Sequence, residues 1–234
     1  MKISERLKEI SEFISPEDKL IDIGCDHALL DIYLCEQYKD LNIIASDIHE
    51  GALKNAKDNV AKHKLEDRIS LRLGDGLTIV NAEEIDTILI SGMGFYTIKD
   101  ILSNEPKMVN VKKIIVQSNT DVVKLRKFVI KLGFKITNEK LVKDNEIIYT
   151  IIEFERGFEK YNYDEIYFGP IIFKKKDDLF YEYYSKKLLK YENLLLQIPK
   201  YEIKSKLHHK HLIKIIRRAL TTPVENQVDE KEEK

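Results

Sequence analysis

The sequence predicts an α/β protein in which helices cover both faces of a largely parallel β-sheet. Three observations lead to this prediction. Residues 19–155 alternate short apolar or β-branched runs with helical patterns, the arrangement that builds a doubly wound sheet. Two longer apolar runs, 134–142 and 147–154, follow each other with only four residues between them, as in a β-hairpin. Beyond residue 174, apolar side chains recur at steps of three and four, which is typical of amphipathic helices.

Five parallel strands are predicted ahead of the hairpin. Each is a short run rich in Ile, Leu and Val that ends at a turn residue, and most are followed by a helical pattern. A helix over 121–132, ended by Gly133, leads into the hairpin, which supplies an antiparallel end to the sheet. The predicted parallel strands are residues 19–24, 42–47, 69–73, 85–91 and 113–117.

Helices are also predicted before and after the sheet segment in the chain. Ser4 can cap a helix that continues through Ile14 and stops before Pro16. On the carboxyl side, Pro199 separates two amphipathic stripes, which indicates a helical hairpin. The predicted organisation is a sheet domain over 1–156, a connector over 157–173, a helical extension over 174–221 and a disordered acidic tail over 222–234.

The composition is that of a globular protein, with 43% hydrophobic and 34% charged residues and no apolar run near the roughly 20 residues of a membrane span. The first residues alternate charges where an export signal would be apolar, so we expect a cytoplasmic protein with Cys25 and Cys35 reduced. Residues 174–220 carry 13 Lys/Arg against five Asp/Glu, although the net charge is only -1. This basic segment is either a solvated surface or a contact for phosphates.

The turn after the first strand, Asp22-x-Gly24-x-Asp26, predicts a nucleotide-like ligand. Gly24 allows a close approach, and the next helix points its N-terminal amides at the same space. A dinucleotide fingerprint would place glycine where Asp26 and Leu29 stand, so a negatively charged pyrophosphate is disfavoured. S-adenosylmethionine carries a sulfonium cation and an amino group, which carboxylates at Asp22 and Asp26 would attract. The charge pattern therefore favours this cofactor over NAD.

Two further strand ends fit the same ligand. Asp47 ends the second strand, 23 residues after Gly24, where a carboxylate accepts hydrogen bonds from both ribose hydroxyls; it could instead cap the helix that begins near Glu50. Gly74-Asp75-Gly76 follows the third strand, where Asp75 could accept a hydrogen bond from the adenine amino group or could serve a plain turn.

A family resemblance rests on motifs along nearly the whole chain. The motifs are Asp22-Ile-Gly-Cys-Asp-His27-Ala28, Ala45-Ser-Asp47-Ile48, Leu73-Gly-Asp-Gly-Leu77, Ser91-Gly-Met-Gly94 and Gln117-Ser118-Asn119. Together they resemble the bacterial tRNA (adenine(22)-N(1))-methyltransferase family. The resemblance implies a Rossmann-like class I methyltransferase domain with a coiled-coil-like helical extension. It also implies methylation of N1 of adenine 22 in tRNA, with S-adenosyl-L-methionine as donor and S-adenosyl-L-homocysteine as product.

The chain departs from the family pattern at three places. The family usually has a second glycine at Phe95, a proline at Ser118 and a proline near Asp31. Phe95 would either narrow the acceptor pocket or supply a ring on which a flipped adenine stacks, and we expect stacking. Its neighbour Tyr96 is expected in the core.

The candidate site follows from these motifs. Asp26 is expected to accept a hydrogen bond from the adenine amino group and to assist as a base, with His27 orienting it, and Asn119 to hold the adenine. Helix capping is the alternative for Asp26, His27 and Asn119. Cofactor contacts are expected at Asp22, Gly24, Asp26, His27, Asp47, Ile48, Gly74, Asp75, Gly76, Ser91, Gly92 and Met93. RNA contacts are expected at Arg6, Lys8, Phe95, Lys204, Lys206, Lys210, Lys214, Arg217 and Arg218.

Two other functions remain open from the residues alone. One is a methyltransferase that acts on a small molecule or a protein side chain, for which the basic helices would be superfluous. The other is a non-catalytic RNA-binding protein that keeps a degenerate methyltransferase fold. We expect a monomer that binds tRNA, without a metal ion, DNA or a membrane as partner.

Overall fold

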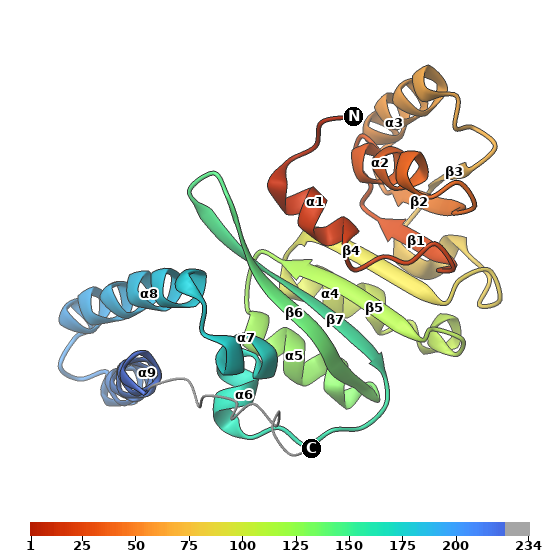
Figure 1. Ribbon diagram of the computed structural model, residues 1–234. Helices are drawn as coiled ribbons and strands as arrows, with labels where there is room; N and C mark the ends of the chain where they lie inside the picture. Colours follow the sequence, from red (N-terminus) through yellow and green to blue (C-terminus); the bar gives the residue numbers. More distant parts are fainter. Residues whose placement is uncertain (223–234) are drawn as a thin grey trace, which may run out of the picture. The chain divides into compact units, whose positions relative to one another are not determined.

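The computed structural model describes residues 1–222, and most of the predicted acidic tail lies outside these described residues. The chain forms two compact units, the first spanning Met1–Tyr161 and the second beginning at Asn162. Figure 1 shows the sheet of the first unit and the helices of the second. None of the described helices is long and apolar enough to cross a membrane.

The first unit contains a seven-stranded sheet in the order β3-β2-β1-β4-β5-β7-β6. Strands β1 to β5 are parallel, and β7 pairs with β5 and β6 in the antiparallel sense. This confirms the predicted class, a parallel sheet with an antiparallel hairpin at its end. The strands are β1 Leu20–Ile23, β2 Ile43–Asp47, β3 Ile69–Leu73, β4 Thr87–Met93, β5 Lys113–Ser118, β6 Phe134–Asp144 and β7 Ile147–Arg156.

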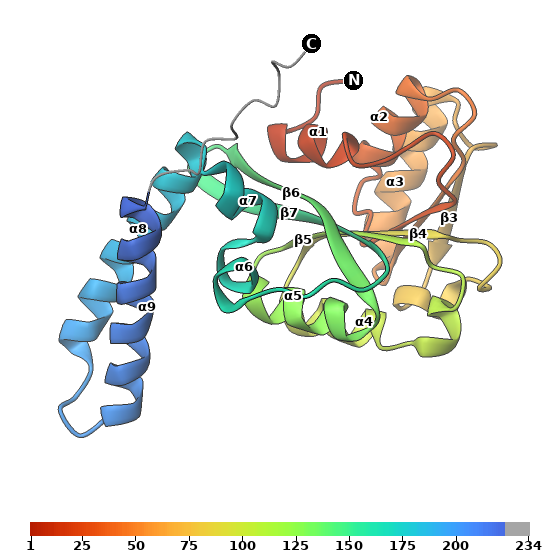
Figure 2. The same cartoon turned by 60° about the horizontal axis from the view of Figure 1, so that its bottom comes forward.

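Helices cover both faces of this sheet, as Figure 2 shows with α1, α2 and α3 on one side and α4 and α5 on the other. The doubly wound arrangement follows from the right-handed crossovers that join parallel strands. The helices of this unit are α1 Glu5–Ser11, α2 Leu29–Gln37, α3 Glu50–His63, α4 Phe95–Leu102 and α5 Val122–Lys131, with short 3₁₀ segments at Gly76–Ile79 and Glu105–Met108.

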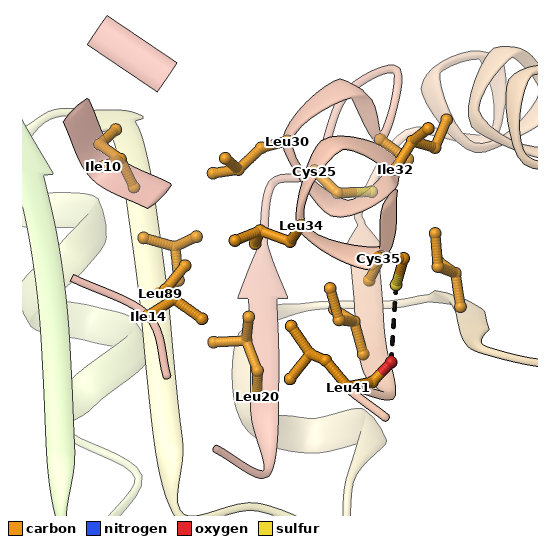
Figure 3. Close-up of a cluster of buried hydrophobic side chains, with 14 of the residues drawn as sticks. Ile10, Ile14, Leu20, Cys25, Leu30, Ile32, Leu34, Cys35, Leu41 and Leu89 are labelled. Atoms are coloured by element: carbon orange, nitrogen blue, oxygen red, sulfur yellow. Dashed lines mark hydrogen bonds between the residues drawn. The ribbon is translucent and has the colours of Figure 1, made fainter. Parts of the chain in front are cut away.

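The core of the first unit lies where α1 and α2 pack on the centre of the sheet. Strand β1 has strands on both sides and helices on both faces, so all four of its residues are buried. Side chains from four elements meet there in Figure 3, and Cys35 donates a weak hydrogen bond from Sγ to the Leu41 carbonyl. Both cysteines are free and buried.

The N-terminal helix is shorter than the sequence predicts. Ser4 accepts a hydrogen bond from the Leu7 amide at 3.3 Å, as expected of a cap, but α1 ends at Ser11 rather than Ile14. The Ser11 hydroxyl donates to the Lys8 carbonyl, and the chain continues in tight turns that keep Phe13 and Ile14 buried. The apolar residues that led to the prediction of a longer helix are therefore buried, but they lie in the turns that follow α1.

The second unit contains the predicted helical hairpin, formed by α8 Asp178–Gln197 and α9 Ile203–Thr221. They run antiparallel, side by side, in Figures 1 and 2. The segment expected as a connector contains two short helices, α6 Tyr163–Phe168 and α7 Pro170–Lys175. Asn162 and Glu165 form a capping box that starts α6, and the rings of Phe168, Phe180 and Tyr184 make the buried centre of the unit.

One fully buried ion pair joins α5 to the β-hairpin formed by β6 and β7. Arg126 donates to Glu139 Oε2 from Nη2 at 2.9 Å and from Nε at 3.2 Å, and both side chains are at most 2% exposed. Removing one partner of such a pair leaves a buried charge without compensation. The pair therefore ties the antiparallel end of the sheet to the helix that precedes it.

We expect Arg126→Met to lower the free energy of unfolding by about 3–5 kcal/mol, because the buried Glu139 carboxylate loses the guanidinium that binds it. Lys112→Met is the control, since Lys112 forms an ion pair with Asp86 but is largely exposed, and its loss should cost under about 1 kcal/mol. Denaturant unfolding of the three proteins measures both. Equal losses in the two variants would contradict the structural role of the buried pair.

Candidate active site

The site begins at the turn after β1. In parallel register, Ile23 of β1 lies beside Ser46 of β2, and the Ser46 carbonyl accepts hydrogen bonds from both the Gly24 and Cys25 amides, at 2.8 and 2.9 Å. Gly24 has a φ of +81°, and a Cβ there would lie 2.3 Å from Cε of Met93. The left-handed backbone favours glycine at this position, and any other side chain would also have to displace the end of the Met93 side chain.

Asp47 is held in place by the backbone at the end of β2. Its Oδ1 accepts the His49 amide at 2.8 Å, and its Oδ2 accepts the Asp26 amide at 3.3 Å. The His49 ring also lies 3.1 Å from Oδ1. Helix α3 begins after His49 without a side-chain cap, so Asp47 organises the turn ahead of the helix. Each carboxylate oxygen can still accept a further hydrogen bond from a ligand.

A cavity of about 520 Å³ opens where these strands end. This size suits a small-molecule ligand. All the residues expected to contact the cofactor line it, from Asp22 in β1 to Met93 in β4. The sequence analysis did not assign a cofactor contact to several other lining residues, because they are apolar or, like His49 and Thr97, lie outside the motifs. They are Leu7, Ile23, Cys25, Leu29, Leu30, His49, Thr97 and Ile101.

The cavity is acidic, and its carboxylates are crowded. Burial and the nearby charge of Asp47 raise the pKa of Asp22 to about 7. Asp31, at the start of α2, is fully buried, and neither of its carboxylate oxygens has a hydrogen-bond partner among residues 1–222. Burial, followed by the charge of Asp22, raises the pKa of Asp31 well above its usual range. A cation bound beside Asp22 would relieve this repulsion.

The carboxyl end of β4, from Ser91 to Met93, forms the opposite wall of the cavity. The Gln117 side-chain oxygen accepts hydrogen bonds from the Arg6 guanidinium, the Ser91 hydroxyl and the Gly92 amide. Asn119 donates from Nδ2 to the Gly92 carbonyl at 2.6 Å. Helix α5 is preceded by Asp121 without a side-chain cap, so Asn119 does not cap that helix. Gln117, a buried amide near the end of an apolar strand, belongs to one of the sequence motifs, but the sequence analysis gave it no role of its own in the site.

Two aromatic residues after this loop differ from expectation. Phe95 is only 6% exposed and packs against Phe128 of α5, so its ring does not offer the stacking face that we expected. Tyr96 was expected in the core but is 62% exposed. Phe95 is the first residue of the amphipathic helix α4 and lies on its buried face. The next side chain along the helix, Tyr96, therefore points to solvent.

Asp26 stands at the mouth of the cavity. Its side chain is 73% exposed, and Oδ1 lies 3.6 Å from His27 Nε2. Helix α2 is preceded by Ala28 and has no side-chain cap, so neither Asp26 nor His27 caps it. Asp26 has a φ of +51°, a conformation that aspartate tolerates better than most residues. The carboxylate is therefore free to meet a second ligand at the cavity mouth.

The residues expected to contact RNA are spread over both units. Arg6 lines the cavity and donates to Ser91 and Gln117, while Lys8 is exposed and does not line it. On α9, Lys204, Lys210 and Lys214 are exposed and Lys206 is half-buried. Arg217 pairs with Glu192, and Arg218 pairs with Asp164.

The residues fit S-adenosylmethionine better than a dinucleotide. Carboxylates stand where a pyrophosphate would need neutral amides, and burial together with the charge of Asp47 raises the pKa of Asp22, an effect that a bound cation would oppose. A Rossmann-like sheet with an antiparallel end and this acidic cavity define a class I S-adenosylmethionine-dependent methyltransferase. The model of the tRNA (adenine(22)-N(1))-methyltransferase family matches residues 20–219, and the chain belongs to that family.

Individual relatives agree with this assignment. The tRNA (adenine(22)-N(1))-methyltransferase of Bacillus subtilis (strain 168) is 31% identical over 205 residues, which are 85% of this chain and 86% of that protein. A Streptococcus pneumoniae protein solved in complex with S-adenosyl-L-methionine is 30% identical with a TM-score of 0.86, covering 94% of this chain and all of that one. The M. capricolum TrmK structure with S-adenosyl-homocysteine is 30% identical with a TM-score of 0.83, covering 94% and 98%.

The comparisons confirm the predicted family, and with it an enzyme that uses S-adenosylmethionine. Within residues 1–222, no group of three or more His, Cys, Asp or Glu side chains could hold a metal ion.

The affinity for S-adenosylmethionine should fall as the pH falls through 7. Asp22 is protonated below its raised pKa of about 7, and a neutral carboxyl no longer attracts the bound cation. When the pH falls from 8 to 6, the Kd of the wild type should therefore rise about tenfold more than the Kd of Asp22→Asn. The variant has no carboxyl group at this position to titrate. Calorimetry at a series of pH values measures it. The variant also shows any pH dependence that comes from the ligand or from other groups, and parallel pH curves for the two proteins would refute the role of Asp22.

Proposed function

We infer that the protein transfers the methyl group of S-adenosylmethionine to N1 of adenine 22 in tRNA. The observation that carries this function is the acidic cavity at the ends of β1 and β2, which faces the loop after β4, in a chain that belongs to the family with this activity. Arrangement and family membership point to the same reaction.

Three carboxylates would hold the donor. Asp22 is placed for the cationic methionine end, Asp47 for the ribose hydroxyls, and Asp75 for the adenine amino group. The backbone amides that donate to Asp47 fix its orientation before the ligand arrives. When bound, S-adenosylmethionine supplies an electrophilic methyl group on a positively charged sulfur.

The acceptor is N1 of adenine, which lies on the Watson–Crick edge and is hidden in a base pair, so the base must be unpaired or flipped. Asp26 is the exposed carboxylate at the mouth of the cavity. It would accept a hydrogen bond from the adenine amino group, holding N1 toward the cavity and stabilising the positive charge that develops on the ring.

Asn119 and Gln117 would act through the loop that receives the base. Asn119 holds the Gly92 carbonyl, and Gln117 holds the Gly92 amide and the Ser91 hydroxyl. Arg6 donates to the same Gln117 oxygen from α1. These contacts fix the loop from both sides, so Asn119 is proposed here as a positioning residue.

The helical hairpin of the second unit would contact the tRNA backbone. Lys204, Lys210 and Lys214 expose ammonium groups along α9, and phosphates are the natural partners of such a row. We propose that the protein acts as a monomer in the cytoplasm, where its tRNA substrate is found.

The function is tested by incubating the protein with labelled S-adenosylmethionine and unmodified tRNA and then identifying the methylated nucleoside. 1-Methyladenosine at position 22 is the expected product, and tRNA with guanosine at position 22 should accept no label. Cofactor binding without any transfer to tRNA would favour a small-molecule or protein methyltransferase. Absence of cofactor binding would favour a non-catalytic RNA-binding protein.

Asp26→Ala should lower kcat by about 100-fold, within the range of a lost general acid–base or hydrogen-bonding group. The Kd for S-adenosylmethionine should change little, because the side chain faces the cavity mouth. Asp26→Asn keeps an acceptor for the amino group and should be intermediate. Single-turnover kinetics and calorimetry separate the two effects. Full turnover in Asp26→Ala would end the catalytic assignment.

Reversing two charges on α9, with Lys210→Glu and Lys214→Glu together, should weaken tRNA binding and reduce the salt slope of log K by about 2. Lys39→Glu with Lys62→Glu is the matched control, because both lysines are exposed on the sheet unit, outside the proposed RNA-binding hairpin. Binding is measured by fluorescence anisotropy between low and moderate salt. If both double variants give the same slope, α9 does not contact the RNA.

A further inference from the structure

Tyr96 is an exposed aromatic side chain directly beyond the loop that faces the cofactor cavity. It follows Gly92-Met93-Gly94-Phe95, and its neighbour Thr97 lines the cavity. Its exposed fraction of 62% exceeds what folding requires, since the inner face of α4 is already filled by Phe95, Ile98 and Ile101. The ring therefore has no evident part in the core.

The ring is nevertheless held in place from below. Its centroid lies 5.2 Å from that of Phe95, with the two planes tilted by 59°. Phe95 in turn packs edge-on against Phe128 of α5, and its amide donates to the Thr120 hydroxyl at 3.1 Å. Because the Tyr96 ring is already packed against Phe95, it loses little side-chain freedom when it binds a partner.

A cation accompanies the ring. Lys124 Nζ lies 5.4 Å from the Tyr96 ring centroid and 3.4 Å from the Tyr96 hydroxyl, with Asp121 Oδ2 at 3.3 Å. The Lys124 side chain is 53% exposed, so its ammonium group can move from these surface contacts to an incoming phosphate. An aromatic face beside a mobile ammonium group suits a nucleotide, because it offers stacking for the base and charge for the backbone.

We propose that Tyr96 and Lys124 form a stacking site for the nucleotide next to the target adenine, with Tyr96 stacking on its base and Lys124 contacting its phosphate. This inference rests on the proposed function, because a target adenine that enters the cavity leaves its neighbour without a stacking partner. Tyr96 replaces that partner at the rim, while the buried ring of Phe95 serves as its support.

The test compares four variants in steady-state methylation of tRNA. Tyr96→Ala should raise the KM for tRNA roughly 5- to 100-fold, because one base–aromatic stack is lost. Tyr96→Phe should stay within about threefold of the wild type, since the ring is kept. Two controls should leave KM unchanged: Phe158→Ala, which removes another exposed ring beyond the far end of β7, and Lys127→Gln, one turn along α5 from Lys124.

A direct measurement uses RNA with 2-aminopurine on either side of the target adenine. Binding to the wild type and to Tyr96→Phe should quench the fluorescence of one of the two probes, whereas binding to Tyr96→Ala should not. Lys124→Gln should keep the quenching but weaken binding and lower its salt dependence. Thermal unfolding and S-adenosylmethionine affinity, which should match the wild type, show that the variants are folded.

The two proposals fail in different ways. If the wild type methylates tRNA and Tyr96→Ala keeps both the wild-type KM and the quenching, the stacking site is wrong and the function stands. If the wild type transfers no methyl group to tRNA, the proposed function fails, while the binding and fluorescence measurements still decide whether Tyr96 stacks on RNA.

Discussion

The active site depends on one shared acceptor, the carbonyl of Ser46, which binds the amides of Gly24 and Cys25. This contact continues the parallel ladder of β1 and β2 into the turn and brings Asp22, Asp26 and Asp47 to the same edge of the sheet. The second wall is set in the same way, because β4 pairs with β5 and its loop bonds to Gln117 and Asn119. Backbone pairing thus brings the ends of these strands, with the carboxylates that follow them, to the same cavity.

The carboxylates of the cavity favour a cationic ligand. Burial disfavours the charged forms of Asp22 and Asp31, and the charge of Asp47 near Asp22 and of Asp22 near Asp31 adds to this effect, which is a cost to the folded protein. Proteins often carry such costs at binding sites, because the same groups interact strongly with the ligand. A sulfonium ion and an ammonium group would offset the repulsion on binding. An anionic dinucleotide would increase it.

Three departures from the family pattern show how the chain adapts locally. Phe95 turns its ring inward, where it packs edge-on against Phe128. Ser118 uses its hydroxyl to bond the Thr120 carbonyl at 2.7 Å and the Met93 carbonyl at 3.4 Å, which joins the ends of β4 and β5. Asp31 is buried without a partner, and its raised pKa is the physical consequence. Each change alters the surroundings of the cavity and leaves the carboxylates lining it in place.

The sequence by itself determined the sheet, its antiparallel end, the helical hairpin and a set of residues that line one cavity, because strand periodicity and the residues after each strand are local signals. Only the tertiary structure decided which of two adjacent aromatic side chains faces inward. Phe95 and Tyr96 are adjacent aromatic residues, and the packing of α4 against α5 buries the first and exposes the second. The end of α1, the helices α6 and α7 and the role of Gln117 were decided in the same way, since each depends on contacts with residues distant in the chain or on turns without a periodic signal.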